Sequence, residues 1–417
     1  MKKRHLLTIK TDSSGNVLLP VGFARRYGFT GGARVRLEED ETGFRLSHPA
    51  DALKRVYIEP TDLCNLDCVT CMRNVWDEPS GRMSMDTFEH ILEGLRDVQP
   101  TPDVFFGGFG EPLSHPHIVE MILQAAQMGA SVELITNGTL LRPALIDGLI
   151  QAGLKRLWVS LDGATPEHYA DVRLGAALPQ VLEGLRYLKE RRQLQGLSLP
   201  RLGIVFVAMK RNIADLPDLL RLSMELGADR LMVTNVLPYT PAMREEMLYR
   251  HSLYFSEASA SEYAPQIDLP RMDLTPTVSK SLLPLLQQGL SVTLARQPLN
   301  QGMNSCPFVE KPSLSVRWDG MVAPCLALLH SHHSYLDDRA RRVQAVSYGN
   351  VREQPLLEIW NAPAYRQLRR RLLVFDFAPC TVCNSCEMAD SNQEDCYGND
   401  APACGGCLWA QGFIQCP

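Results

Sequence analysis

The sequence EPTDLCNLDCVTCMRN (residues 59–74) places Cys64, Cys68 and Cys71 within eight residues, in the spacing C-x3-C-x2-C. A short apolar run at 56–58 comes just before it and is typical of a buried strand. The cysteines should therefore lie on the loop that follows this strand. A cubane [4Fe–4S] cluster has four iron corners, which four thiolates normally hold. Three neighbouring thiolates would leave one iron open, so the spacing predicts a cluster with a vacant position for another molecule.

A zinc ion, completed by His115 or His117, is the alternative occupant of this loop. Structural zinc sites are usually built from C-x2-C pairs, which the spacing C-x3-C-x2-C fits poorly. The chain has 12 cysteines, and none lies between residues 72 and 305. Such clustering indicates metal ligation rather than scattered buried thiols. The nine cysteines beyond residue 300 are Cys306, Cys325, Cys380, Cys383, Cys386, Cys396, Cys404, Cys407 and Cys416.

The composition is that of a globular protein. The 417 residues are 45% hydrophobic, which excludes a disordered chain and allows two or three domains. The net charge of −5 argues against a protein that mainly coats nucleic acid. No apolar run approaches the roughly 20 residues of a membrane span, and the basic start MKKRHLLTIK leads into no signal-peptide core. We therefore expect a cytoplasmic protein without a membrane partner, in which disulfides are rare and clustered cysteines bind metals.

Strand and helix patterns alternate between residues 56 and 239. Six strands interleaved with five helices predict an α/β fold with a parallel sheet. Six βα units are too few for a closed eight-stranded barrel, so we expect an open, partial (β/α)6 barrel that works at the carboxyl ends of its strands. The expected strands are VYIEP, DVFFGGF, SVELIT, RLWVSLD, RLGIVFVAM and RLMVTNV. The expected helices cover 85–98, 116–128, 144–152, 178–192 and 215–226.

Glycines and polar side chains follow several of these strands, where the ligand of such a barrel is expected. The segment FFGGFGEPL (105–113) ends the second strand, and its glycines would let the backbone approach a ligand closely. ITNGT (135–139) and VSLDG (159–163) end the third and fourth strands. Local turn capping is the alternative role for Asn137 and Asp162. The candidate binding residues are Gly108, Gly110, Glu111, Thr136, Asn137, Ser160 and Asp162, with Asn235, Met209 and Lys210 as weaker candidates.

Four domains are expected from these patterns: 1–48, 49–240, 241–300 and 301–417. The first is β-rich and basic, with nine Lys or Arg against five Asp or Glu. The third is a linking region rich in Pro, Ser and Met, with a helix near TVSKSLLPLLQQG. The fourth is rich in loops and cysteines, as in a fold that metals hold together. His330, His332 and His333 have no regular spacing, which favours a polar surface loop over a metal site.

The nine cysteines of the fourth domain could hold two clusters, which need eight thiolates and would leave one thiol spare. Zinc ribbons built from Cys380 with Cys383 and from Cys404 with Cys407 are the alternative. The spacing by itself leaves the partition of these ligands open.

The three-cysteine loop after the first strand of a partial barrel resembles the radical S-adenosylmethionine (radical SAM) enzymes. The resemblance implies that the open iron binds the amino and carboxylate groups of SAM, and that an electron then cleaves SAM to a 5′-deoxyadenosyl radical. It also implies that the glycine segment meets the SAM amino group and that the other strand-end candidates reach its carboxylate, its ribose or the substrate. The family usually has an aromatic residue before the third cysteine, where this chain has Thr70.

The tail, with G-x4-C at 320–325 and the C-x2-C group that follows, looks like a SPASM domain. That resemblance implies auxiliary [4Fe–4S] clusters, although C-x2-C-x2-C-x9-C departs from the usual spacing. The whole chain resembles tungsten-cofactor oxidoreductase radical SAM maturases, through SVRWDGMVAPCLALLH, YGNVREQPLLEIWN, FAPCTVCNSC and CGGCLWAQGFIQCP. GNVLLPVGFARRYGFTGGARVRL is similar to swapped-hairpin AbrB-like domains, which bind DNA, but here we favour docking of a protein partner.

The implied activity is modification of a tungsten-containing oxidoreductase, its metallo-pterin or an associated peptide. The implied partners are SAM, a low-potential electron donor of ferredoxin or flavodoxin type, and a peptide or protein substrate. Two alternatives stay open: a peptide-crosslinking enzyme, and a redox-sensing regulator that binds DNA through its N-terminal unit. The open-iron spacing and the glycine segment favour an enzyme, because a sensor needs no SAM pocket.

Overall fold

The structure is a computed structural model of the chain. It describes residues 9–21, 24, 35–40, 43–47, 51–76, 78–250, 267–270, 275–276, 278–281, 292–294, 297–298, 305–336, 338–381, 383 and 386–417. Within these ranges, no helix is long and apolar enough to span a bilayer.

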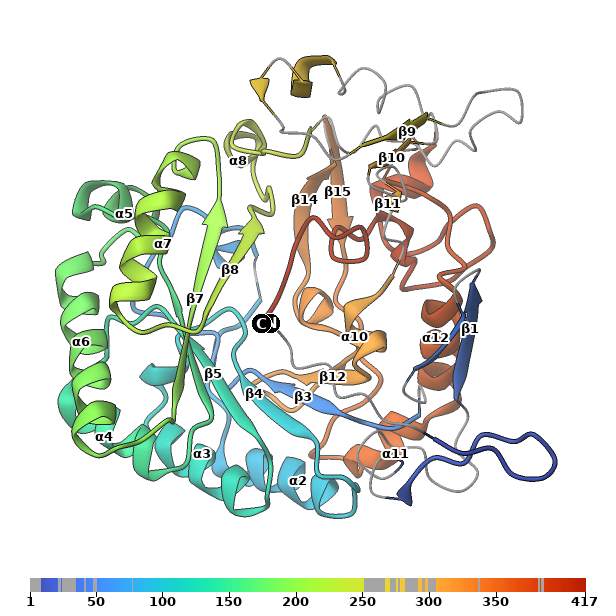
Figure 1. The fold of residues 1–417 in the computed structure, drawn as a ribbon, viewed down its shortest axis with the longest axis horizontal. Helices are drawn as coiled ribbons and strands as arrows, with labels where there is room; N and C mark the ends of the chain where they lie inside the picture. Colours follow the sequence, from blue (N-terminus) through green and yellow to red (C-terminus); the bar gives the residue numbers. More distant parts are fainter. Residues whose placement is uncertain are drawn as a thin grey trace.

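A curved eight-stranded sheet forms the centre of the molecule, with the strand order β13-β12-β3-β4-β5-β6-β7-β8 (Figure 1). Every neighbouring pair is parallel except β12 with β13. The strands are β3 (Arg55–Ile58), β4 (Asp103–Phe106), β5 (Val132–Thr136), β6 (Arg156–Ser160), β7 (Arg201–Ala208), β8 (Arg230–Asn235), β12 (Ser313–Val316) and β13 (Val322–Ala323). The six predicted strands β3 to β8 are thus confirmed, in the predicted order and direction.

The helices of the barrel cover the outer face of this sheet (Figure 1). They are α2 (Met85–Arg96), α3 (Ile118–Gln127), α4 (Pro143–Gln151), α5 (Pro166–Val172), α6 (Leu178–Leu194) and α7 (Leu216–Glu225), whereas the short α8 (Pro241–Glu245) lies beyond the end of β8. Side-chain oxygens cap several of them: Ser84 accepts from the N–H of Thr87, and Thr165 from that of His168. The five predicted helices are confirmed. Helices α5 and α8 are additions, because these short elements carry too few apolar positions to show a period.

The C-terminal region contributes two strands to the barrel sheet, which the sequence patterns did not predict. Strand β12 pairs in parallel with β3, in the register Ser313 to Arg55 and Val316 to Ile58. SLSV and VA are too short to stand out among loops and become strands by pairing with an edge that is already formed. The barrel and the cysteine-rich region therefore share one sheet.

Two further helices, α11 (Leu356–Asn361) and α12 (Pro363–Val374), fasten the C-terminal region to the barrel. The indole N–H of Trp360 donates to the backbone carbonyl of Asp51 at 2.8 Å. Arg369 is buried against Trp360, with its guanidinium carbon 3.7 Å from the ring centroid. The Cβ of an alanine at position 94 would lie 2.5 Å from the Leu356 side chain, so Gly94 allows α2 and α11 to approach closely.

Smaller elements complete the described chain. The strands are β1 (Arg36–Asp40) and β2 (Gly43–Ser47), which pair antiparallel; β9 (Ile267–Leu269), β10 (Val292–Leu294) and β11 (Gln297–Pro298); and β14 (His332–Leu336) with β15 (Arg339–Val343). The short helices are α10 (Pro307–Glu310) and the 3-10 turns η1 (Met72–Val75), η2 (Pro112–Ser114), η3 (Ile213–Asp215), η5 (Leu326–Leu328), η6 (Glu387–Asp390) and η7 (Cys404–Gly406). Most of the helix expected near 277–289 lies outside the described residues.

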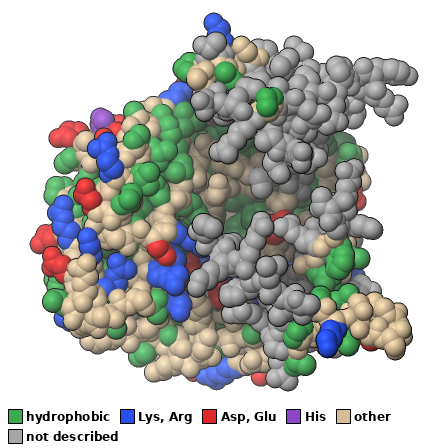
Figure 2. All heavy atoms as spheres, in the orientation of Figure 1, with side chains coloured by type: hydrophobic (Ala, Val, Ile, Leu, Met, Phe, Trp, Pro, Cys, Tyr) green, Lys and Arg blue, Asp and Glu red, His purple; other side chains and the backbone are tan. Residues whose placement is uncertain are grey.

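The residues at the end of the chain enter the barrel, at the point marked C in Figure 1. The amide of Asn235 donates to the carbonyl of Phe413 at 2.9 Å, and the N–H of Gln415 donates to the Thr234 hydroxyl at 2.8 Å. Tyr57, on strand β3, donates its hydroxyl to the carbonyl of Pro417. On the face shown in Figure 2, hydrophobic side chains surround a hollow at the centre, and most of the charged ones lie on the outer helices.

Candidate active site

The three cysteines of the first loop and the strand-end candidates line one cavity. Its volume is about 180 Å³, whereas one water needs only about 10–15 Å³ on the same measure. Its wall comes from the loop after β3, the glycine segment after β4, the ends of β5 and β6, and Tyr239 after β8. The lining residues include Cys64, Cys68, Thr70, Cys71, Gly108, Gly110, Glu111, Thr136, Asn137, Ser160, Arg173 and Tyr239. Six of the seven predicted binding residues are therefore brought together with the cysteines, and Asp162 lies just behind the wall.

Gly110 lets the glycine segment pack directly against the start of the cysteine loop. The Cβ of any other residue there would lie 2.2 Å from the carbonyl oxygen of Thr61 and 2.7 Å from that of Leu63. The N–H of Glu111 donates to the Leu63 carbonyl at 2.9 Å, which joins the two segments. The spacing between the cysteines and the glycine segment is thus set by backbone contact, which leaves no room for a side chain.

Replacing Gly110 with alanine should disturb the cysteine loop, because the new methyl group meets backbone atoms that cannot rotate away. Overpacking of this kind costs about 1–3 kcal/mol. We expect loss of about four irons per chain, one cubane, and at least a tenfold fall in SAM cleavage, measured by iron analysis and by 5′-deoxyadenosine formation. Gly148→Ala is the matched control, since its Cβ would lie 3.5 Å from Val119, an ordinary contact. Wild-type iron content in Gly110→Ala would contradict the contact.

Glu111 lines the cavity but is buried, and its carboxylate is held by hydrogen bonds. It accepts hydrogen bonds from the Thr136 hydroxyl at 2.6 Å, the N–H of Asn137 at 2.7 Å and the N–H of Leu113 at 3.0 Å. Burial raises the pKa of Glu111, although these hydrogen bonds act in the opposite direction. The carboxylate therefore ties the glycine segment to the end of β5, and only the backbone of Glu111 is available to a ligand.

Asn137 connects the end of β5 to the cysteine loop. Its amide nitrogen donates to the side-chain oxygen of Asn65 at 3.0 Å and lies 3.7 Å from the sulfur of Cys64. Its oxygen accepts from the N–H and the hydroxyl of Thr139. Asn137 therefore caps its own turn, which was the alternative role, and also donates toward a candidate ligand sulfur, whereas its contact with SAM or substrate stays a prediction. Hydrogen bonds to cluster sulfurs tune the reduction potential of a cluster.

Arg173 is a residue of the cavity that sequence reasoning missed. It follows α5, and its buried guanidinium pairs with the Asp162 carboxylate at 2.7 Å and lies 4.0 Å from the sulfur of Cys68. Burial raises the pKa of the Cys68 thiol to about 11, and the positive charge of Arg173 acts in the opposite direction. A buried cation at the cavity wall favours a bound carboxylate. Sequence reasoning missed Arg173 because it is a single arginine after a short helix. No spacing pattern distinguishes such a residue from a surface arginine.

The remaining strand-end candidates have other contacts. Asp162 also accepts from the N–H of Val207 at 2.7 Å, so it holds Arg173 and β7 in place instead of reaching into the cavity. Ser160 lines the cavity, as predicted. Met209 is buried outside the cavity, Lys210 is exposed, and Asn235 contacts Phe413. None of these three lines the cavity described above.

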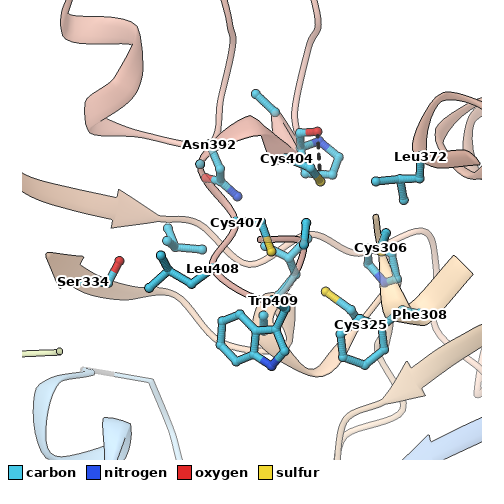
Figure 3. A pocket seen from close by; sticks show the side chains of 18 of the residues that line it. Cys306, Phe308, Cys325, Ser334, Leu372, Asn392, Cys404, Cys407, Leu408 and Trp409 are labelled. Atoms are coloured by element: carbon cyan, nitrogen blue, oxygen red, sulfur yellow. Dashed lines mark hydrogen bonds between the residues drawn. The ribbon is translucent and has the colours of Figure 1, made fainter. Parts of the chain in front are cut away.

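A second cavity, shown in Figure 3, lies in the C-terminal region and is lined by four cysteines. These are Cys306, Cys325, Cys404 and Cys407, which come from segments far apart in the sequence but face a common centre. Burial raises the pKa of Cys306 to about 12 and also raises those of the other three. Four half-buried thiols in a mostly apolar wall would become thiolates more readily beside a compensating positive charge such as iron. The donor set fits a cubane cluster.

The two glycines of the CGGC sequence are required by close contacts. The Cβ of an alanine at 405 would lie 1.7 Å from the carbonyl oxygen of Ala378, and one at 406 would lie 1.8 Å from the Arg341 guanidinium. Arg341 is buried, and it donates to the carbonyls of Ala389 and Ala403. Burial lowers the pKa of Arg341, and the charges of the nearby cysteines act in the opposite direction. This arginine places a positive charge beside a set of candidate anionic ligands.

The other five tail cysteines, Cys380, Cys383, Cys386, Cys396 and Cys416, are not among the residues that line this cavity. Burial raises the pKa of Cys380, and the charges of Cys396 and Cys383 add to it. Cys386 begins the η6 turn in the same segment, and Cys396 is exposed. Cys416 lies instead with the residues that enter the barrel, and its sulfur accepts from the indole N–H of Trp409 at 3.1 Å.

Among the described residues, no three His, Cys, Asp or Glu side chains converge closely enough to hold a single metal ion. Thiolates on different corners of a cubane lie farther apart than ligands that share one ion. His115, a proposed fourth zinc ligand, is buried, and its ring contacts the carbonyl of Met83.

The prediction of a polar surface loop at 330–333 is wrong for two of its three histidines. His330 and His332 are buried, and only His333 is exposed. Tertiary packing explains the difference: His330 lies between two carboxylates, and His332 begins β14, where its ring contacts that of Tyr239, with centroids 6.2 Å apart. Since Tyr239 lines the first cavity and His332 the second, this ring pair separates the two.

Comparisons with known proteins agree with this geometry. A model of the radical SAM superfamily matches residues 58–222, and a model of the SPASM iron-sulfur cluster-binding domain matches residues 306–387. The tungsten-containing aldehyde ferredoxin oxidoreductase cofactor-modifying protein of Pyrococcus furiosus is 31% identical over 369 residues, covering 88% of this chain and 97% of that protein. The chain belongs to the radical SAM superfamily. It is an enzyme of that family, with a [4Fe–4S] cluster, SAM and auxiliary iron–sulfur clusters in its SPASM domain.

Other relatives of this radical SAM enzyme act on peptides or share its fold. The PqqA peptide cyclase of Bradyrhizobium diazoefficiens is 32% identical over 192 residues, which cover 45% of this chain and 48% of that protein. Among solved structures, Streptococcus suis SuiB bound to SAM has a TM-score of 0.51 at 16% identity, covering 81% of this chain and 71% of SuiB. The likeness to SuiB shows that the two chains share a fold.

Proposed function

We propose that this radical SAM/SPASM maturase acts on a tungsten-containing oxidoreductase, on its metallo-pterin or on a peptide associated with it. The observation that carries the proposal is the convergence of Cys64, Cys68 and Cys71 with the glycine segment on one cavity. The name of the Pyrococcus furiosus relative, which aligns over nearly the whole chain, supports the tungsten-enzyme substrate.

The residues of the cavity have separate roles in this proposal. Cys64, Cys68 and Cys71 hold a cluster that, once bound and reduced, supplies the electron for cleavage of SAM. The backbone at Gly108 and Gly110 accepts from the SAM ammonium, because these glycines leave carbonyls accessible. Arg173, with Ser160 beside it, pairs with the SAM carboxylate. The residues entering the barrel help to exclude water, which would otherwise quench a carbon radical.

Incubation of the reconstituted, reduced enzyme with SAM tests the reaction, and addition of the target tests the substrate. We expect 5′-deoxyadenosine from the enzyme with SAM, and a faster rate together with a mass change when the unmodified tungsten oxidoreductase is present. A ferredoxin or flavodoxin is the proposed electron donor and should replace a chemical reductant. No 5′-deoxyadenosine from fully loaded enzyme would refute the cleavage reaction, and an unaltered oxidoreductase would refute the substrate.

Peptide crosslinking is the second candidate, and the relation to PqqA peptide cyclase favours it. A cysteine-rich peptide encoded beside this chain would then become the substrate, with a mass loss of two hydrogens per crosslink. The regulator alternative has less support, because both cavities are lined by candidate ligands for enzyme cofactors. If the protein retarded the migration of DNA at moderate salt, that result would support the regulator alternative.

We further infer a partition of the tail cysteines between two auxiliary clusters. One set is Cys306, Cys325, Cys404 and Cys407, which share the cavity in Figure 3. The other set is Cys380, Cys383, Cys386 and Cys396, and Cys416 is left outside both. The electrostatic coupling between Cys380, Cys383 and Cys396 supports the second set.

Iron counting on single variants tests this partition. Three clusters require about twelve irons per chain. Cys404→Ala should lower the content to about eight, because removing one of four thiolates leaves a labile corner. Cys416→Ala, the matched cysteine variant, should keep about twelve. A loss of four irons in Cys416→Ala would assign that cysteine to a cluster and overturn the partition.

A further inference from the structure

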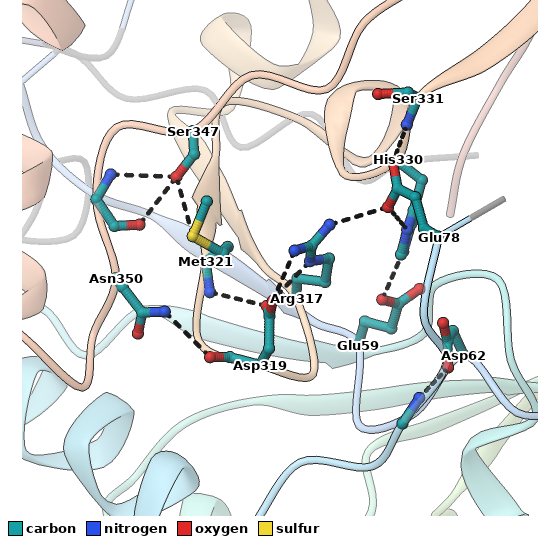
Figure 4. A network of polar contacts seen from close by, with 12 residues as sticks. Glu59, Asp62, Glu78, Arg317, Asp319, Met321, His330, Ser331, Ser347 and Asn350 are labelled. Atoms are coloured by element: carbon teal, nitrogen blue, oxygen red, sulfur yellow. Dashed lines mark hydrogen bonds and ion pairs between the residues drawn. The ribbon is translucent and has the colours of Figure 1, made fainter. Parts of the chain in front are cut away.

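A buried polar network joins the end of β3, the loop after the cysteines and the SPASM region (Figure 4). At its centre is His330, whose side chain is fully buried. Its Nε2 lies 2.9 Å from a carboxylate oxygen of Glu59, and its Nδ1 lies 2.8 Å from a carboxylate oxygen of Glu78. Trp76 stacks on the imidazole at a centroid distance of 4.0 Å. None of the predicted binding or cluster residues belongs to this group.

Both acceptors of His330 are carboxylates, so both ring nitrogens must donate, as only an imidazolium can. Burial would lower the pKa of His330, but the hydrogen bonds and charges of Glu59 and Glu78 outweigh burial and raise it. Glu78 has further donors, the N–H of Ser331 at 2.7 Å and the guanidinium of Arg317 at 2.9 Å. Within the described part of the chain, Glu59 forms an ion pair with His330 alone, so His330 is its counter-ion.

The carboxylate of Glu59 also holds the glycine segment. Its second oxygen accepts from the N–H of Phe109 at 3.0 Å. Gly108 has φ +140°, and a Cβ there would lie 2.6 Å from the Glu59 side chain, so the residue must be glycine for this contact to form. Gly108, Phe109 and Gly110 all line the first cavity. The chain of contacts thus runs from His330 through Glu59 to the backbone that faces the cosubstrate.

We propose that His330 is a positioning residue for SAM: its imidazolium orients Glu59, and Glu59 fixes the backbone of residues 108–110 that receives the SAM ammonium. The inference rests on the proposed cosubstrate cavity. A residue of the SPASM region would then influence the binding of SAM without contacting SAM. The charge of His330 is essential, because without it Glu59 would be a buried carboxylate that has lost its ion-pair partner, which is unfavourable.

The test compares reconstituted full-length wild type with His330→Gln, the double variant Glu59→Gln/His330→Gln, and His115→Gln. His115 is the control, since it is also a buried histidine but contacts a carbonyl instead of a carboxylate. Equilibrium dialysis with labelled SAM gives Kd, and 5′-deoxyadenosine formation at saturating SAM gives the rate. Iron content and Tm report on folding.

We expect His330→Gln to raise the Kd for SAM about tenfold, within the coupling energies seen for buried networks. Its rate at saturating SAM should stay within about threefold of wild type, with full iron content. The double variant should recover most of the affinity, because the neutral amide introduced in place of the Glu59 carboxylate can still accept from the N–H of Phe109. His115→Gln should leave the Kd unchanged.

An unchanged Kd in His330→Gln would overturn the inference. Parallel losses of SAM affinity, iron and Tm that the double variant fails to correct would also overturn it, because they would indicate a merely structural role. Failure of the wild type to cleave SAM would refute the proposed function, whereas the Kd values would still test His330.

Discussion

Replacing Cys68 with alanine should abolish 5′-deoxyadenosine formation while the iron content falls only from about twelve to about eight per chain. Two thiolates, Cys64 and Cys71, would remain at the loop, too few to retain a cubane with an open corner. The auxiliary sites should be unaffected, because their cysteines line a different cavity and lie on other segments. Iron analysis and chromatography of the nucleoside products measure the two effects.

Cys416→Ala serves as the control for cysteine removal, judged by iron content. Twelve irons retained in Cys68→Ala would show that the loop holds no cluster. A wild type that contains zinc and about eight irons would favour the zinc alternative at the same loop. Either result would remove the basis for placing SAM in the first cavity.

Replacing Arg173 with methionine should have the second largest effect, because one side chain serves both stability and binding. Removing it leaves Asp162 as a buried, unpaired carboxylate, and breaking a buried ion pair in this way costs about 3–5 kcal/mol. It also removes the cation proposed for the SAM carboxylate. We expect a lower Tm and at least a hundredfold loss of affinity for SAM, measured by thermal unfolding and equilibrium dialysis.

The double variant Asp162→Asn/Arg173→Gln separates these two contributions. Without either charge the buried site is neutral, so most of the stability should return. The affinity for SAM should stay low, since glutamine supplies no positive charge. Wild-type affinity in the double variant would show that Arg173 has only a structural role, and the proposed carboxylate contact would be wrong.

Local spacing explains why much of the site could be predicted. The C-x3-C-x2-C loop, the glycine segment and the polar strand ends are each contiguous in sequence, and parallel strands bring their carboxyl ends to one edge. Gly110 is an example, because its backbone lies so close to the Thr61 carbonyl that no side chain fits at this position. Ser160 and Asn137 followed from the same reasoning. Asp162 was misjudged in role, because its partner Arg173 follows a short helix that showed no period.

The sequence by itself determined the partial barrel, the loop with three cysteines and the kind of cofactor, since alternating patterns and short-range spacing encode them. Only the tertiary structure decided which four cysteines face one cavity, that β12 extends the barrel sheet, and that His330 lies buried between Glu59 and Glu78. The reason is physical: these features depend on contacts between segments up to 271 residues apart. Residue type and local period carry no information on such distant partners.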